Sequence, residues 1–63
     1  PDAEITFPTI LDATYRVETT SDTVNVPWTV LFDGLAGTGA PMTVTDVNAL
    51  ETPPRFYRVI VFR

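Results

Sequence analysis

The order of apolar and polar residues along the chain is typical of short β-strands separated by turns. Apolar runs recur about every 8–12 residues, and no stretch of ten residues shows the 3.6-residue periodicity of a helix. Thr and Val are frequent, and proline occurs six times. This pattern predicts an all-β fold of the sandwich or barrel type.

Strands are predicted at five places: Ala3 to Phe7, Ala13 to Thr19, Trp28 to Phe32, Pro41 to Thr45 and Phe56 to Arg63. The second strand has the clearest alternation, because Tyr15 and Val17 lie in one phase and Arg16 and Glu18 in the other. Such alternation is expected of an antiparallel sheet that has one face in water. We therefore expect a small antiparallel β-sandwich of five to six strands.

The third strand is predicted to follow a break in the chain. Even positions from Val24 to Phe32 are all apolar, with Val26, Trp28 and Val30 between them, but Pro27 interrupts the run and cannot donate a ladder hydrogen bond. The glycine-containing stretch 33–40 is predicted to be a loop that needs positive φ or close backbone approach. The connection 46–54 is predicted to hold one helical turn at 47–50 and to be stiffened by Pro53-Pro54.

The last strand is apolar on nearly both faces, which predicts a central position with cover on each side. Its expected partner is the strand Ala13 to Thr19, because both contain a Tyr-Arg-Val triplet. In that arrangement Arg58 either pairs with Glu18 or lies over Tyr15. The residues expected to cover this strand are Trp28, Val30, Met42 and Val44.

Composition excludes several classes of function. The 63 residues are enough for one domain, and the chain has no cysteine and no histidine. Zinc sites built on Cys or His and Ser-His or Cys-His catalysis are thereby excluded. The net charge is −4 and all four basic residues are arginines, without a basic cluster. This argues against nucleic acid and against insertion into or binding to an anionic membrane.

The residues also resemble a known kind of module, on these motifs: Tyr15-Arg16-Val17, Thr19-Thr20-Ser21-Asp22, Trp28, Gly37-Thr38-Gly39, Thr45-Asp46 and Phe56-Tyr57-Arg58-Val59. The pattern is similar to small fibronectin- or immunoglobulin-like accessory modules of secreted proteins from environmental bacteria, and the likeness covers residues 5–62. It implies a single β-sandwich module over residues 1–63, secreted or at the cell surface. The missing initiator methionine predicts that the chain was processed or excised from a larger protein.

Trp28 is the candidate ligand-binding residue, because sugar rings stack on exposed aromatic side chains. Tyr15, Tyr57 and Phe56 allow the same interpretation, but each lies in phase with aliphatic residues on its own strand, so we expect them in the core. The core is also the favoured place for Trp28, but by a smaller margin, because Trp28 follows Pro27, where a sheet edge is expected.

The carboxylates Asp12, Asp22, Asp33 and Asp46 fall in predicted turns. Together they could bind Ca²⁺ or act as a glycosidase pair, but ordinary Asx-turns are the preferred explanation, because no Asp-x-Asp-x-Asp loop is present. We expect no metal site, no cofactor and no enzymatic activity.

Two functions follow from these observations. The first is a non-catalytic accessory or spacer module of a secreted bacterial protein, joined to catalytic or adhesive domains of its parent protein and assisting attachment to polysaccharide. The alternative is a self-associating structural subunit of an extracellular fibre or surface layer, in which edge strands pair.

Overall fold

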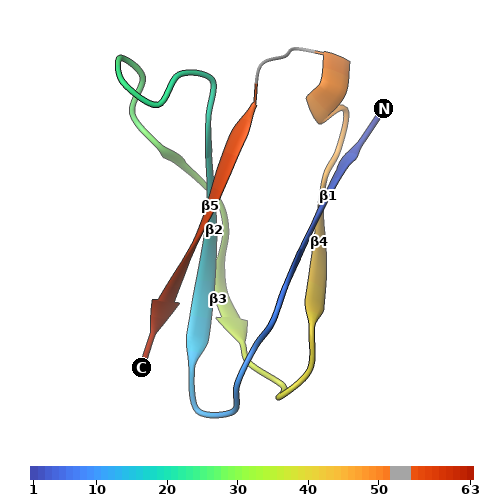
Figure 1. The fold of residues 1–63 in the computed structure, drawn as a ribbon, viewed down its shortest axis with the longest axis vertical. Coiled ribbons are helices and arrows are strands. Elements are labelled where there is room, and N and C mark those ends of the chain that lie inside the picture. The colour runs from blue at the N-terminus through green and yellow to red at the C-terminus, as the bar shows by residue number, and fades with distance from the viewer. Residues whose placement is uncertain (52–54) are drawn as a thin grey trace.

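The computed structural model describes residues 1–51 and 55–63, and shows an all-β fold (Figure 1). Its elements are β1 (Ala3–Phe7), β2 (Thr14–Thr20), β3 (Thr29–Ala36), β4 (Met42–Asp46), the 3₁₀ helix η1 (Ala49–Glu51) and β5 (Phe56–Phe62). All five predicted strands are confirmed: β1 has the predicted bounds, and the other four are shifted at one or both ends. The predicted helical turn lies near η1, while Pro53-Pro54 falls outside the described residues.

The strands form two antiparallel sheets that face each other, as predicted for a sandwich. One sheet pairs β1 with β4, and the other has the order β3-β2-β5. In Figure 1 the three-stranded sheet stands on the left and the two-stranded sheet on the right. Residues far apart in sequence therefore become neighbours, such as Ile5 with Val44 and Val17 with Val59.

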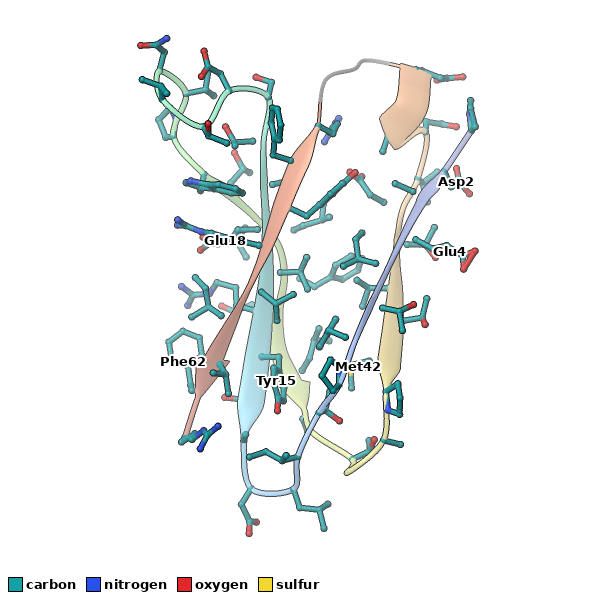
Figure 2. The ribbon with its side chains drawn as sticks, in the orientation of Figure 1. Asp2, Glu4, Tyr15, Glu18, Met42 and Phe62 are labelled. Atoms are coloured by element: carbon teal, nitrogen blue, oxygen red, sulfur yellow. The ribbon has the colours of Figure 1, made fainter. Side chains whose placement is uncertain are left out.

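The core lies between the two sheets, and Figure 2 shows Tyr15 and Met42 pointing into this space. Its buried members are Phe7, Ala13, Tyr15, Val17 and Val44, with Ile5, Leu31, Phe32, Leu35 and Met42 packed against them. Val17 is fully buried at 0% exposure, and the rings of Phe7 and Tyr15 meet with centroids 5.6 Å apart. The predictions that Tyr15 belongs to the core and that Met42 and Val44 face inward are confirmed.

The predicted central position of the last strand is wrong. The central strand is β2, and β5 is an edge strand that pairs with β2 alone among the described residues. The physical reason is that the two-stranded sheet packs on β2 and β3, so no described residue of β5 joins the core cluster. Val59 and Val61, in register with the buried Val17 and Tyr15, are consequently 37% and 44% exposed.

The predicted apolar face of the third strand is also wrong. Val24, Val26 and Val30 are exposed, and only Phe32 of the even positions packs against the core. Strand β3 begins after Pro27, as expected, but its register with β2 shifts twice, which resets the inward phase. Because Val30 lies opposite Glu18, it faces away from the core and does not cover the last strand.

The stretch 33–36 continues β3 instead of forming a loop, and Gly34 takes φ +66° within this strand. The chain then crosses to β4 through a connection held by Thr9, a buried residue. Its hydroxyl donates to the carbonyl of Ala40 at 2.6 Å and accepts the N–H of Thr38 at 3.0 Å. This connection therefore has fixed hydrogen-bond partners although it contains no regular structure.

Candidate functional site

The face of the three-stranded sheet that points away from the core carries a cluster of charged and aromatic side chains. We define this outer-face cluster as Arg16, Glu18, Trp28, Asp33, Arg58 and Phe62. Figure 2 shows Glu18 and Phe62 on this side, opposite to Tyr15. Arg16 and Glu18 lie on β2, Asp33 lies on β3, and Arg58 and Phe62 lie on β5, while Trp28 comes just before β3.

Glu18 is the centre of the outer-face cluster. The β2–β5 register places it opposite Arg58, whose Nε donates to its Oε1 at 2.6 Å, and Arg16 lies 3.7 Å from its other oxygen. The predicted pairing of Arg58 with Glu18 is confirmed. The carboxylate is buried at 6% exposure, so the two arginines compensate a charge that has little access to water.

Arg16 also donates two hydrogen bonds to Asp33 on β3, one to Oδ1 at 3.2 Å and one to Oδ2 at 3.3 Å. These bonds, followed by the N–H of Gly34, lower the pKa of Asp33. The partnership raises the pKa of Arg16. Two arginines face two carboxylates across the cluster, so its local charge is balanced.

Trp28, the predicted ligand-binding residue, lies half-buried beside this cluster. The guanidinium of Arg58 is positioned over its ring, 4.3 Å from the centroid, and Arg16 covers the ring of Phe62 in the same way at 5.0 Å. Both are cation–π contacts within the usual range. One face of the Trp28 ring is therefore occupied by the protein itself.

Replacing Arg58 by leucine is expected to lower the free energy of unfolding by about 1–2 kcal/mol, because the buried carboxylate of Glu18 loses the nearer of its two arginine partners. The effect stays moderate because the Arg58 side chain is 47% exposed and Arg16 remains near Glu18. Urea denaturation of dilute protein measures it. The matched control is Arg63→Leu, the same change at the exposed end of the chain, which should alter stability little. Equal losses in both variants would contradict this account.

Asp46 and Tyr57 connect the two sheets at the start of β5. The Tyr57 hydroxyl donates to Asp46 Oδ2 at 2.8 Å, and Arg55 lies 3.3 Å from the same oxygen. Burial, followed by the bond to Asp46, raises the pKa of Tyr57. Asp46 is buried within β4, so the prediction that it lies in a turn is wrong.

The remaining carboxylates act separately. Asp22 accepts the N–H groups of Val24 at 2.8 Å and Asn25 at 3.3 Å, as in an Asx-turn, and these bonds with the Asn25 amide lower its pKa. Asp12 takes φ 66° at the turn before β2. Within residues 1–51 and 55–63, no group of three acidic side chains could hold a metal ion, and no pocket is present.

The free edge of β5 is the second candidate for function. Phe56, Val59, Val61 and Phe62 are between 37% and 44% exposed, on both faces of the strand. The strand contains no Gly or Pro and keeps an unbroken register with β2. Strand edges in monomeric proteins are usually blunted by bulges, Pro or charges. Strand β5 has no bulge and no Pro, and its one charge, Arg58, is paired with Glu18, so this edge is open to pairing.

Sequence reasoning missed the Arg16–Asp33 and Arg16–Phe62 contacts. The outward phase of Arg16 was visible, but its partners depend on the shifted β2–β3 register and on β5 lying beside β2. Comparisons with protein-family models, curated proteins and solved structures found no match to this chain. None of the helices described is long and apolar enough to span a membrane.

Proposed function

We propose that this chain is a non-catalytic structural module that associates with further copies of itself through the free edge of β5. The observation that supports this most is the exposure of apolar side chains on both faces of an edge strand, at Phe56, Val59, Val61 and Phe62. A strand added to this edge would gain main-chain hydrogen bonds and would cover these side chains.

The other edges offer less to a partner. Strand β3 is interrupted by two register shifts and by Gly34 in a left-handed conformation, features that bend an edge away from pairing. Strand β1 carries the exposed Glu4 and is followed by Pro8, and the exposed side chains of β4 are threonines. These differences favour β5 as the associating edge.

The immunoglobulin- or fibronectin-like character and the accessory role in a secreted bacterial protein are part of this proposal and rest on the motif resemblance. The face-to-face antiparallel sheets support the first of these. Attachment to polysaccharide through Trp28 has weaker support than edge pairing, because Arg58 covers one face of that ring.

Sedimentation equilibrium over a wide concentration range tests the self-association. The wild-type chain should dimerise as concentration rises, whereas Ile60→Glu should remain monomeric, because a carboxylate on the β5 edge opposes pairing in the same way as other edge charges. The new carboxylate would face Arg16 on β2, so the monomer should keep its fold.

The matched control is Val30→Lys, which introduces a charge at an exposed position on the opposite edge of the same sheet, facing Glu18. It should dimerise as the wild type does. A strictly monomeric wild type, or equal weakening by both substitutions, would overturn the proposal.

A further inference from the structure

Resting on the proposed self-association, we infer that the strand added to β5 is β5 of a second copy, running antiparallel about a two-fold axis that passes through Ile60. The result is a continuous sheet of six strands in the order β3-β2-β5-β5-β2-β3. The choice follows from symmetry, from the charges on the strand and from the register between β2 and β5 in the structure.

Symmetry limits the possible registers. Alternate residues of β5 direct their N–H and C=O groups toward β2, and the residues between them direct these groups toward the free edge. Two residues that lie opposite in an antiparallel pair must be of the same kind. For two identical strands, the axis must therefore pass through a residue and not between two residues, and the inner faces of both copies lie on the same side.

Charge and the length of the overlap together select the residue that holds the axis, because an axis at Tyr57 or Val61 opposes no like charges but pairs fewer residues of β5 than an axis at Ile60. An axis at Arg58 opposes the two Arg58 side chains, and an axis at Val59 places Arg55 opposite Arg63 on both sides of the centre. Like charges in direct opposition destabilise a ladder. With the axis at Ile60, arginine opposes only aromatic residues, Tyr57 with Arg63 and Arg58 with Phe62, so no like charges meet across the new ladder.

The inner face gains most from this register. Val59 of one copy lies opposite Val61 of the second copy, and each already lies beside a buried residue of its own β2, Val17 and Tyr15 respectively. A row of four apolar residues then crosses from one β2 to the other. The two valines that the two-stranded sheet leaves uncovered acquire apolar neighbours.

The outer face accepts the same register. Arg58 approaches the ring of Phe62 in the second copy, while its charge remains paired with Glu18 of its own chain at 2.6 Å. Strand β5 carries no acidic residue, so the acidic side chains behind the net charge of −4 lie on other parts of each copy. The one charge on β5 itself, that of Arg58, is already paired within its own chain, so it adds little repulsion between the two strands.

Cysteine scanning tests this register, because the natural chain has no cysteine. The single variants Ile60→Cys, Val59→Cys and Val61→Cys would each be oxidised at a concentration where the wild type is dimeric, and the disulfide dimer quantified on a non-reducing gel. Directly opposite residues have Cα atoms about 4.5–5.5 Å apart, within disulfide range, whereas diagonal neighbours at about 7–8 Å are too distant.

We expect Ile60→Cys to be converted largely into the disulfide dimer while the other two variants remain mainly monomeric on the gel. Circular dichroism of each reduced variant checks that it is folded. Fastest cross-linking of Val59→Cys or Val61→Cys would overturn the Ile60 register and leave self-association through β5 in place. A wild type that dimerises while no variant cross-links would overturn the Ile60 register, and the comparison of Ile60→Glu with Val30→Lys would then decide whether β5 forms the contact. A wild type that stays monomeric would overturn both proposals.

Discussion

Replacing Gly37 by alanine is expected to lower the free energy of unfolding by about 3 kcal/mol or more, which is at the upper end for an overpacked site. A Cβ at this position would overlap the carbonyl oxygen of Ile10 and approach Tyr15 Cε2 to 3.1 Å. The carbonyl oxygen of Ile10 is a backbone atom, so no side-chain rotation relieves the overlap. The N–H of Gly37 also donates to the carbonyl of Ala13 at 2.9 Å, which holds the two segments together.

The control for Gly37→Ala is Gly34→Ala. Gly34 has φ +66° but open space around its Cα, with nothing within 4 Å of an added Cβ. This variant should cost only the left-handed backbone strain, about 1–2 kcal/mol. Urea denaturation followed by circular dichroism compares the two. If Gly34→Ala proved as harmful as Gly37→Ala, close backbone approach would not be the reason that residue 37 is glycine.

Replacing Phe7 by alanine is expected to lower the free energy of unfolding by about 3–5 kcal/mol, because a large buried side chain leaves a cavity. Phe7 is 7% exposed and its ring packs on Tyr15, in the only core that the described residues share. A chain of this length has a total stability of about 3–9 kcal/mol, so this substitution removes about a third of it or more. The far-ultraviolet spectrum and the urea midpoint measure the loss.

Phe56→Ala makes the same chemical change on the edge strand and is the matched control. Phe56 is 42% exposed, and its carbonyl oxygen, which accepts from the Thr19 hydroxyl, is kept in the variant. We expect a loss below about 1.5 kcal/mol, less than a full burial contributes. Similar losses for the two phenylalanines would mean that β5 belongs to the core after all.

Much of the fold could be predicted from the sequence because it depends on local patterns. Alternation located β2, proline marked the start of β3, and the shared Tyr-Arg-Val triplets identified β2 and β5 as partners. The place of β5 in the sheet could not be predicted in this way. A strand covered on both faces and an edge strand with uncovered faces have the same apolar composition, and only the packing of the two-stranded sheet distinguishes them.

The candidate site was predictable to a smaller extent. The Glu18–Arg58 pair follows from strand pairing alone, and the Asx-turn at Asp22 follows from residue type. The stacking of Arg58 on Trp28 depends on how the segment after Pro27 returns across the sheet, and the Arg16–Asp33 bond depends on the bulged register of β3. Neither contact could be predicted from the order of apolar and polar residues in a single sequence.

The strand order also bears on how the chain folds. Strands β2 and β3 are close in sequence, whereas the β2–β5 pairing brings Glu18 to Arg58 and the β1–β4 pairing brings Ile5 to Val44. The chain loses conformational entropy when it closes these long loops, and it does so before the strand contacts form. Chains dominated by pairs of sequence-distant strands therefore fold slowly, in milliseconds to seconds. We expect the β2–β3 hairpin to form early and β5 to pair with β2 late. Until β5 pairs, during synthesis and refolding, the side of β2 that β5 later occupies is an unpaired sheet edge.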